Sequence, residues 1–504
     1  MDLWSLVQGA ATRWPNALML VSRQGDQCTF SEFRERALHM AAGLEQRGVR
    51  RGDVVSWILP TWVDTVVLAA ALSRLGAIQN PIIGIYRGRD VEFCVQQTRA
   101  RFLITPDLFN GTDFGEMGRE IASKHGRLTH LVVDPGAFPS ADPSDLSAFA
   151  QSARRDVRWI CYTSGTAADP KGALHADATV GAFDTAMAEC LDVRHGDRYA
   201  LVFPFPHIGG IGLLFMALRT GCTHLLDAIV DPVATVAFLA ENRCTHAGTG
   251  TAFFNMYLAA QEQRGSPLFP NLKACGAGGA PTALRLHRRI LRELGAPVVS
   301  AWGLTEAPVL TSNRLGDPVD RMETTEGRPL PGVEIRVVDG NGVECATGVQ
   351  GELRVRGPQL MLGYQDAALD RVAFDALGYF RTGDLGAIDR DGYVTITGRA
   401  KDVIIRNGEN IAAREVEDLL LAVDGIVDAA VIGVADDRTG EAVCAVIVSS
   451  GTPPTLEELR AALTTAGLRK QAVPTRLEVR AMLPRNPAGK VLKRQLLDEL
   501  LQAD

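Results

Sequence analysis

The stretch YTSGTAADPKG, residues 162–172, narrows the choice of fold and chemistry more than any other segment. It follows a short apolar run, Trp159 to Tyr162, that is typical of a strand, and it gathers hydroxyl side chains, glycines and one lysine in a single loop. Such a loop lets backbone N–H groups and a point charge approach a polyphosphate closely. It does not match the Walker A pattern G-x-x-x-x-G-K-[ST]. Taken alone, the segment is also compatible with a polar surface turn.

The segments on either side of this loop alternate between helical and strand-like patterns. The apolar spacing predicts helices over 31–45 and 63–75 and strands over 54–59, 130–133 and 199–203. Such alternation indicates α/β layers. The run 63–75 contains Asp64 and Arg74 and is too short to cross a bilayer, so we expect it to be a buried helix.

The second half of the chain changes character twice. From Gly327 to Thr397, short β runs such as 333–338 and 351–355 are separated by Asp-Gly and Asn-Gly turns, which indicates a β-rich subdomain. Beyond residue 400 a compact α+β tail follows, with one-face helical spacing at Val416, Leu419, Leu420 and Val423 and a capping-box pattern at Thr455 and Glu458. We therefore predict an α/β fold with an N-terminal domain over 1–398, a hinge at 399–401 and a C-terminal domain over 402–504.

Composition excludes several classes of function. The net charge of −7 gives no electrostatic support for a nucleic-acid or anionic-membrane role. Nine scattered cysteines without C-x-x-C spacing favour a reducing cytoplasm over a disulfide framework or a zinc site. The N-terminus lacks the pattern of a secretory signal, so we expect a cytoplasmic protein without a membrane span. The excess of Arg over Lys, with abundant Ala and Gly, suggests a GC-rich bacterial genome.

Six further motifs follow the loop in order along the chain. They are PFPHIGG (204–210), GAGGAP (276–281), AWGLTE (301–306), YFRTGDL (379–385), GRAKD (398–402) and PRNPAGK (484–490). The ordered set resembles the adenylate-forming superfamily, which comprises acyl- and aryl-CoA synthetases, the adenylation domains of peptide synthetases, and luciferases. The resemblance implies a large AMP-binding domain with an acyl pocket and a small mobile C-terminal domain.

The resemblance also implies the roles of individual residues. The positions matching ATP- or AMP-binding motifs are Thr163, Ser164, Gly165, Thr166, Lys171, Gly278, Gly279, Ala280, Trp302, Gly303, Thr305, Asp384, Arg399 and Lys490. Carboxylate attack on the α-phosphorus of ATP brings two anions together, so their charge must be neutralised in the transition state. Among the catalytic residues, Lys490 would contact the carboxylate and α-phosphate, Glu306 would hold Mg²⁺, and Lys171 would assist the pyrophosphate.

The resemblance implies in the same way which residues would bind the nucleoside. Asp384 would accept hydrogen bonds from the ribose hydroxyls, Arg399 would hold the ribose from the other side, and Trp302 would stack on adenine. The chain uses only seven lysines, yet Lys171, Lys401 and Lys490 fall in motifs, which suits a flexible point charge that must come and go.

Two positions depart from the family pattern. The phosphate loop has Ala167-Ala168 where the family usually has Thr-Gly, so one hydroxyl and one flexible residue are lost. Trp302 replaces the more usual Tyr and keeps a stacking face.

The acyl pocket is implied to be lined by His207, Ile208, Gly209, Gly248, Gly276 and Ala301. Residues 205–208 contain no carboxylate, so an α-amino acid would bury an unpaired cation, and we reject the peptide-synthetase branch. The local sequence looks most like the cyclohexanecarboxylate-CoA ligase-like and medium-chain branches. His207 either gates the carboxylate or packs.

The size of that pocket is predicted from its glycines. The glycines at 209, 210, 248, 250, 276 and 278 would widen the cavity for an apolar, alicyclic or bulky acid, although glycine equally marks backbone turns.

The loop after the hinge is the segment in which we expect the thiol substrate to bind. Beyond the hinge residue Lys401, the segment containing Asn407, Gly408 and Glu409 is similar to the loop that forms the pantetheine tunnel of acyl-CoA synthetases. Asn-Gly is equally a hairpin turn.

We expect an ATP-dependent acyl-CoA synthetase that uses ATP, Mg²⁺ and coenzyme A, with a small carboxylic acid as substrate. The alternatives are an acyl-AMP ligase that loads an acyl carrier protein, a luciferase-like oxidase, and a non-catalytic nucleotide-binding homologue. Whether the chain forms a homodimer is left open.

Overall fold

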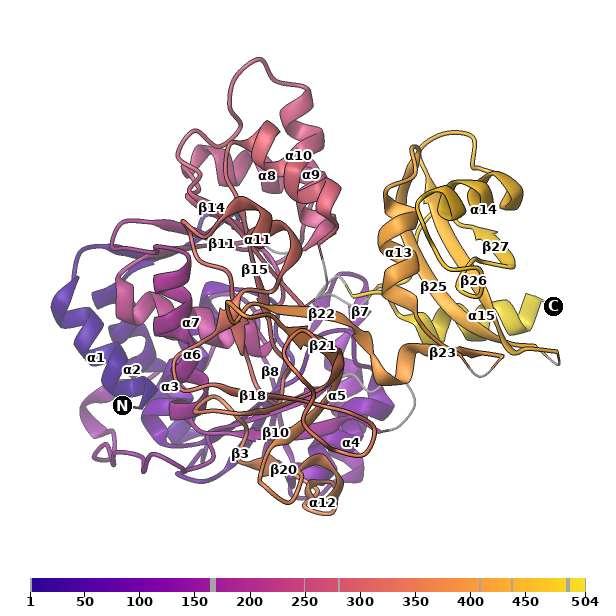
Figure 1. Cartoon of the computed structure of the whole chain (residues 1–504). Helices are drawn as coiled ribbons and strands as arrows, with labels where there is room; N and C mark the ends of the chain where they lie inside the picture. Colours follow the sequence, from indigo (N-terminus) through magenta and orange to yellow (C-terminus); the bar gives the residue numbers. More distant parts are fainter. Residues whose placement is uncertain are drawn as a thin grey trace.

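The computed structural model describes residues 2–163, 169–248, 250–279, 282–407, 409–436, 438–485 and 490–503. Two sheets of the large domain enclose a layer of helices, and a separate small domain follows the last strand of the large one (Figure 1). The mixed α/β class, with a large N-terminal and a small C-terminal domain, is confirmed. The domain limits 1–398 and 402–504 stay a prediction, although the short helix η2 (Ala400–Asp402) falls between the sheets of the two domains.

The first sheet is mainly parallel and runs in the order β17-β16-β15-β14-β13-β11-β12-β1-β2. Its strands are β1 Leu18–Ser22, β2 Gln27–Thr29, β11 Arg198–Leu201, β12 Thr223–Leu226, β13 His246–Gly248, β14 Ala274–Gly278, β15 Val298–Trp302, β16 Thr311–Ser312 and β17 Arg328–Pro329. The carboxyl ends of β14 and β15 lie together, because Gly278 pairs with Ala301. The segments that follow these two strands contain two of the predicted motifs.

The second sheet runs in the order β20-β10-β9-β4-β3-β5-β8. Its strands are β3 Val54–Trp57, β4 Ile78–Pro81, β5 Phe102–Thr105, β8 Thr129–Val132, β9 Trp159–Thr163, β10 Lys171–His175 and β20 Gly363–Tyr364. The two-stranded β6 Leu108–Phe109 and β7 Thr112–Asp113 stand apart from it. The predicted strand before the phosphate loop is therefore β9, and the chain returns antiparallel to it as β10.

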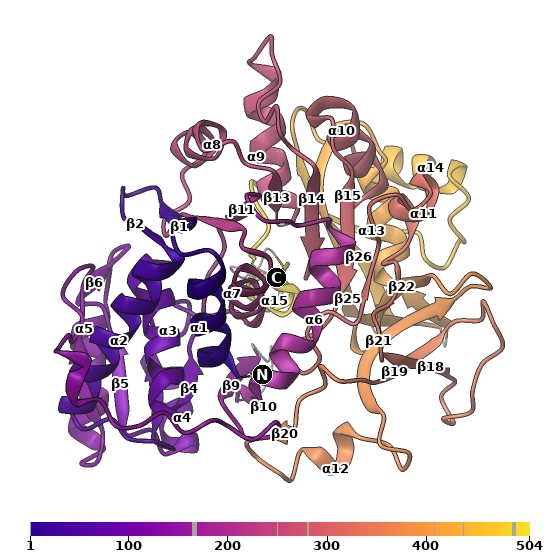
Figure 2. The same ribbon diagram turned by 90° about the vertical axis from the view of Figure 1, so that its left-hand side faces the viewer.

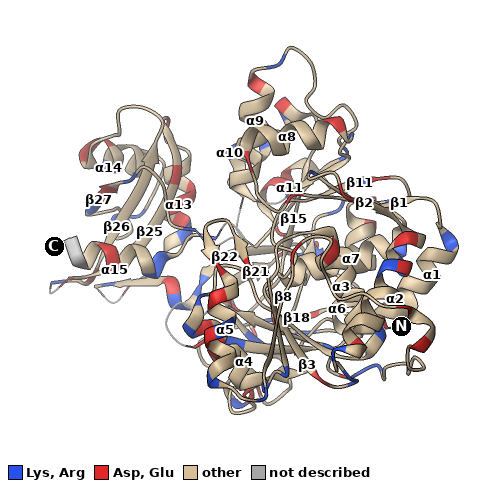
Figure 3. Cartoon of the chain, turned by 180° about the vertical axis from the view of Figure 1, so that it is seen from behind, with Lys and Arg blue, Asp and Glu red and all other residues tan. Residues whose placement is uncertain are grey.

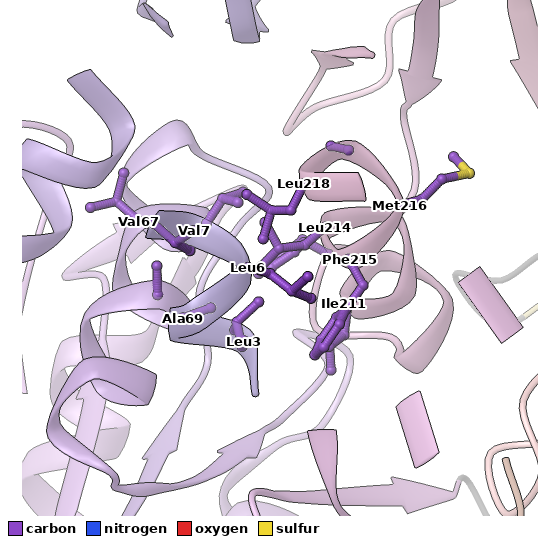
Figure 4. Packing of buried hydrophobic residues seen from close by; sticks show 14 of the residues in the cluster. Leu3, Leu6, Val7, Val67, Ala69, Ile211, Leu214, Phe215, Met216 and Leu218 are labelled. Atoms are coloured by element: carbon purple, nitrogen blue, oxygen red, sulfur yellow. The ribbon is translucent and has the colours of Figure 1, made fainter. Parts of the chain in front are cut away.

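The helices between the sheets are held by an apolar core that both sheets share. Residues of α1, α3 and α7 meet in it, with Leu3, Leu6 and Val7 facing Leu214 and Leu218 (Figure 4). The helices of the large domain are α1 Leu3–Arg13, α2 Phe30–Gln46, α3 Val63–Leu75, α4 Gly88–Thr98, α5 Phe114–Lys124, α6 Asp177–Cys190, α7 Ile208–Thr220, α8 Pro232–Glu241, α9 Thr251–Glu262, α10 Leu284–Leu294, α11 Val319–Thr324 and α12 Asp370–Ala373, with the short η1 Pro143–Asp145. Figure 2 shows α1, α2 and α3 stacked beside α6 and α7.

Helix α3 shows why the buried-helix prediction holds. It spans Val63–Leu75, as predicted, and nearly all of its side chains are buried. Its one acid, Asp64, accepts from Arg36 at 2.6 Å and from the Gly136 N–H at 2.8 Å, so the buried charge is paired. The helix ends at Gly76, which takes the left-handed φ of +71°. Within the described ranges, no helix combines the length and apolarity that crossing a membrane requires.

The β-rich subdomain and the small domain follow in sequence. The predicted β runs become the antiparallel sheet β18-β19-β21-β22, of strands β18 Glu334–Val338, β19 Gly351–Arg356, β21 Phe380–Ile388 and β22 Val394–Arg399. The small domain contains β23 Val403–Arg406, β24 Glu409–Ala412, β25 Ile426–Asp436, β26 Gly440–Ser449 and β27 Arg476–Val479, with helices α13 Ala413–Leu421, α14 Leu456–Thr465 and α15 Lys493–Ala503. The capping box predicted for α14 is present, since Thr455 and Glu458 each bond the other's backbone.

Candidate active site

The phosphate loop joins two paired strands. Thr163, the last residue of β9, lies directly opposite Lys171, the first residue of β10. Both ends of the loop are therefore fixed by the antiparallel ladder, and Lys171 is at its exit. Of the residues predicted to bind phosphate there, Ser164, Gly165 and Thr166 lie outside the described residues, as does the Ala167-Ala168 departure.

A tyrosine that the sequence analysis missed connects the loop lysine with the predicted metal ligand. The Tyr364 hydroxyl donates to Glu306 Oε1 at 2.7 Å, and Lys171 Nζ is 5.8 Å from the centre of the Tyr364 ring. Strand β20 brings Tyr364 there by pairing antiparallel with β10, with Ala173 opposite Tyr364. Lys171 and Glu306 thus share one neighbour, although 135 positions separate them in the sequence.

The backbone around Glu306 is held from two sides. His175 Nε2 is 2.8 Å from the Thr305 carbonyl, and the Met361 N–H donates to the Glu306 carbonyl at 2.8 Å. A carbonyl only accepts, so His175 Nε2 carries the proton. Burial lowers the pKa of His175 to about 4, which keeps the ring neutral. His175 therefore fixes the position of the predicted metal ligand rather than taking up protons.

The surroundings of Glu306 indicate how it could hold a magnesium ion. Among the described residues, no group of three or more His, Cys, Asp or Glu side chains could hold a metal ion. Mg²⁺ is commonly held by one or two carboxylates together with substrate phosphates. One oriented carboxylate near the phosphate loop fits that mode, so Glu306 stays the predicted ligand.

Asp384 lies at the centre of a buried hydrogen-bond group. Its Oδ2 accepts from Trp302 Nε1 at 2.8 Å, and its Oδ1 forms an ion pair with Arg399 Nε at 2.7 Å. Asp384 and Arg399 face each other on the paired strands β21 and β22, and Trp302 ends β15. Only 4% of the Asp384 side chain is exposed. Each carboxylate oxygen can accept two hydrogen bonds, so the predicted ribose contact remains compatible with this arrangement.

The turns that follow β14 and β15 require glycine. A Cβ at Gly303 would lie 2.3 Å from the Val309 nitrogen, and Gly279 takes a left-handed φ of +78° just after β14. Ala280, predicted to contact adenine, lies outside the described residues. Trp302 itself is buried in an apolar cluster with Ala307 and Leu310, so its stacking on adenine stays a prediction.

A cleft of about 2100 Å³ lies between the large and small domains, and it brings many of the predicted residues together. Those that line it are Gly279, Ala301, Trp302, Gly303, Asp384, Arg399, Lys401 and Lys490. Arg399 and Lys401 belong to the predicted hinge, Lys490 belongs to the predicted small domain, and the others belong to the predicted large domain. Lys171 and the residues predicted for the acyl pocket, apart from Ala301, are not part of its lining.

The surroundings of Lys490 lower the pKa of its ammonium group. Desolvation lowers its pKa to about 8; the positive charges of Arg399 and Lys401 act in the same direction, while Asp384 and Asp402 oppose them. The predicted catalytic lysine of the small domain thus lines the same cleft as Asp384 and Arg399, which are predicted to bind the ribose.

This shift predicts a pH dependence. Only the protonated lysine brings a positive charge, and a pKa lowered to about 8 means that the charge is present below that pH and lost above it. We therefore expect kcat/KM for ATP–pyrophosphate exchange, which reports the free enzyme, to fall as the pH rises past about 8. Lys490→Arg should lack this alkaline limb, because guanidinium stays charged. A wild-type profile that stays flat from pH 7 to 10 would contradict the role given to Lys490.

The predicted acyl-pocket segment begins at a helix N-terminus. His207 is the N-cap of α7, and its Nδ1 accepts from the Gly209 N–H at 3.1 Å. Desolvation lowers the pKa of His207 to about 4, so the ring is neutral and carries its proton on Nε2. Its ring meets Phe203 edge to face at 6.3 Å. Both predicted roles of His207, gating and packing, remain compatible with this geometry.

Four of the glycines predicted to widen the pocket differ in how much space surrounds them. A Cβ at Gly210 would lie 2.6 Å from the Phe205 carbonyl oxygen, and one at Gly248 would lie 2.9 Å from that of Gly276. These two positions allow close backbone approach, so the expectation that they add open volume has to be revised. At Gly209 the nearest atom is His207 Nδ1 at 3.2 Å, and at Gly278 it is 3.5 Å away, so these two leave more room.

The loop predicted to form the thiol tunnel is a hairpin. Strands β23 and β24 pair antiparallel with Arg406 opposite Glu409, and Asn407 takes a left-handed φ of +53°. The hairpin interpretation is therefore confirmed. Gly408 lies outside the described residues, and the tunnel stays a prediction.

Comparison with known proteins places this arrangement in a family. The protein-family model described as AMP-binding enzyme matches residues 7–365 of the chain. The family model described as AMP-binding enzyme C-terminal domain matches residues 415–490. The chain belongs to the AMP-binding enzyme family. It is an adenylate-forming enzyme of the acid–thiol ligase class.

Relatives and solved structures of this family align over nearly the whole chain. A salicyl-AMP ligase / salicyl-S-ArCP synthetase of Mycobacterium tuberculosis is 33% identical, over 98% of this chain and 90% of the relative. A 3-[(3aS,4S,7aS)-7a-methyl-1,5-dioxo-octahydro-1H-inden-4-yl]propanoyl:CoA ligase of Rhodococcus jostii is 32% identical, over 97% of this chain and 99% of the relative. The crystal structure of ATP-bound MatB from Rhodopseudomonas palustris superposes with a TM-score of 0.88, at 26% identity and over 99% of both chains.

Proposed function

We propose that this AMP-binding enzyme activates a carboxylic acid as an acyl-adenylate and then transfers the acyl group to coenzyme A. In the first step an oxygen of the acid attacks the α-phosphorus of ATP, and the bond to pyrophosphate breaks. In the second step a thiolate attacks the acyl carbon, and AMP leaves. The observation that carries the proposal is the cleft that Lys490 of the small domain lines together with Asp384 of the large domain and Arg399 of the hinge.

The residues of this chain have separate tasks in the first step. Asp384, oriented by Trp302 and Arg399, would hold the ribose, and Lys490 would neutralise charge between the two anions. Lys171 would contact the departing pyrophosphate at the exit of the phosphate loop. Glu306, oriented by Tyr364, would hold Mg²⁺, which supplies further neutralisation of the phosphates when bound.

The small domain would serve both steps by changing its position about Lys401 in the short helix η2. A lysine in the mobile domain can assist adenylation only while that domain is closed over ATP. Transfer would require the β23–β24 hairpin, with Asn407 and Glu409, to approach the adenylate instead.

Apart from its reacting carboxylate, the acid is proposed to be uncharged, apolar, and alicyclic or bulky. His207 is neutral, and the described residues assigned to the acyl pocket include no carboxylate that could pair with a substrate ammonium. The relative from Rhodococcus jostii, whose name specifies an octahydroindene ring, supports a bulky alicyclic substrate. An ATP–pyrophosphate exchange screen over alicyclic, linear and amino acids tests this. A palmitate-like acid with the highest kcat/KM, or an amino acid that outperforms its deaminated analogue, would defeat it.

Gly209→Leu is a sharper test of the pocket. Because a Cβ at this position already lies 3.2 Å from the His207 ring, the larger side chain must extend into the space beside it. We expect kcat/KM for a ring-bearing acid to fall on the order of tenfold or more, and that for a short linear acid to change little. Equal losses for both acids, measured by exchange, would remove Gly209 from the acyl pocket.

Loading of a carrier protein is the second candidate. The relative from Mycobacterium tuberculosis is named as both an AMP ligase and a synthetase of an ArCP thioester, at 33% identity. Free CoA and a holo-carrier protein present the same phosphopantetheine arm, so kinetics with each acceptor distinguish the two functions. A kcat/KM at least tenfold higher for the holo-carrier protein would favour this candidate.

A further inference from the structure

Arg414 reaches from the small domain to the large one. It lies in the first turn of α13, on the side of the small domain nearer the large domain (Figure 1). Its Nη1 donates to the Ile396 carbonyl of β22 at 2.6 Å, and its Nη2 is 3.6 Å from Glu326 Oε1. The two charged side chains are only 19% and 15% exposed. This contact is therefore less screened than a surface ion pair.

The acceptors of Arg414 are held rigidly. The Glu326 N–H donates to the Val394 carbonyl at 2.8 Å, and the Glu326 carbonyl accepts from Thr311 Oγ1 at 2.6 Å. Glu326 thus joins β16 to β22, and its backbone is held by contacts within the large domain alone. A preorganised acceptor costs less conformational entropy on contact.

The same helix holds the segment that contains Lys490. Glu417, one turn after Arg414, pairs with Lys493 Nζ at 2.6 Å and accepts from the Val431 N–H at 2.8 Å. Lys493 is three positions beyond Lys490. The orientation of α13 is therefore transmitted to the Lys490 segment from its C-terminal side.

Arg485, the last described residue before Lys490, is held within the small domain as well. Arg485 pairs with Asp428 of β25 at 2.7 Å and forms an isolated antiparallel bridge with Val491. The Leu492 N–H donates to the Pro484 carbonyl at 2.8 Å. Lys490 thus moves with α13 and β25 as one unit.

A second ion pair between the domains is weaker. Arg285 of α10 is 3.5 Å from Asp424, with side chains 60% and 101% exposed, so water and salt screen it. Figure 3 shows acidic residues along α13, two of which, Glu415 and Glu417, pair with Arg469 and Lys493 within the small domain. Of these two ion pairs, the one formed by Arg414 is the more withdrawn from water.

We propose that Arg414 is a positioning residue that latches the small domain in the arrangement that brings Lys490 to Asp384 and Arg399. The latch rests on the proposed function, in which the small domain serves two half-reactions from two positions. It favours adenylation, because a contact made in only one of two arrangements shifts their populations toward that arrangement. Release of Arg414 is then a step that precedes thiol transfer.

Arg414→Ala tests the latch through the two half-reactions. We expect ATP–pyrophosphate exchange to fall on the order of tenfold, as for loss of one charged hydrogen bond. Transfer from supplied acyl-adenylate to the thiol that the wild type accepts should stay unchanged or become faster. Arg414→Lys should restore part of the exchange, because it keeps the charge near Glu326. The matched control is Arg469→Ala, which removes an ion pair to Glu415 of the same length, 3.6 Å, on the same helix but within the small domain.

The outcomes separate the latch from the function on which it rests. Equal loss of both half-reactions in Arg414→Ala, or unchanged exchange, would overturn the latch, while a wild type active in both half-reactions would leave the proposed function intact. A wild type without exchange on any acid would overturn both. If Arg414→Ala does not fold, Glu326→Gln replaces it and should show the same selective loss to a smaller degree; no selective loss there would also overturn the proposal.

Discussion

Lys490→Ala is expected to lower ATP–pyrophosphate exchange by on the order of 100-fold or more, while transfer from supplied acyl-adenylate stays largely intact. Lys490 lies in the cleft beside Arg399 and Asp384, where its charge would meet the carboxylate and the α-phosphate. An adenylate that is supplied ready-made no longer needs that charge. The two rates, measured on the same preparation by isotope exchange and by thioester formation, give the result directly.

The control for this change is Lys470→Ala, which removes an exposed lysine from the same small domain. It should leave both half-reactions unchanged. Equal losses in the two half-reactions of Lys490→Ala would show that one arrangement of the domains performs both steps, and the division of work between two arrangements would be wrong.

Asp384→Ala should produce the second large effect, on both ATP use and stability. The substitution leaves Trp302 Nε1 and Arg399 Nε without their common acceptor at a position that is nearly closed to water. Loss of one partner from such a buried group costs about 2–4 kcal/mol. We expect the KM for ATP to rise on the order of tenfold or more and the thermal transition to fall by several degrees.

Asp384→Asn keeps one acceptor oxygen and should recover part of the stability but little of the ATP affinity. Asp498→Ala is the matched control, because it breaks an ion pair with Arg494 whose partners are 48% and 56% exposed. Exposed pairs contribute about 0–1 kcal/mol, so its thermal transition should move little. A normal KM for ATP in Asp384→Ala would place the ribose elsewhere.

Much of the fold was predictable because its patterns are local. The limits of α3 follow from a continuous apolar run that ends at Gly76, and those of α14 from the capping box at Thr455. The hairpin at Asn407 follows from its turn dipeptide in the same way. In each case the residues that determine the element lie within a few positions of one another.

The residues that the sequence analysis missed act across distant segments. Tyr364 is in a two-residue strand that matters only because it pairs with β10, and His175 reaches Thr305 from another sheet. A buried histidine one strand after the phosphate loop was the available signal for His175. The sequence offered no signal for Arg414, because its partners depend on how the two domains are placed.

Two of the glycines, Gly210 and Gly248, failed as volume markers for a related reason. Sequence shows that a side chain is absent at Gly210 and Gly248 but not what occupies the space, and at both positions backbone does.

Coupling of ATP cleavage to thioester formation through an acyl-adenylate can be followed in the product balance of one reaction. The purified chain is incubated with ATP, Mg²⁺, CoA and the best acid of the exchange screen, and all products are quantified. We expect AMP, pyrophosphate and acyl-CoA in equal amounts, with none formed when the acid is omitted. ADP and orthophosphate in place of AMP and pyrophosphate would show that the chain does not form an acyl-adenylate.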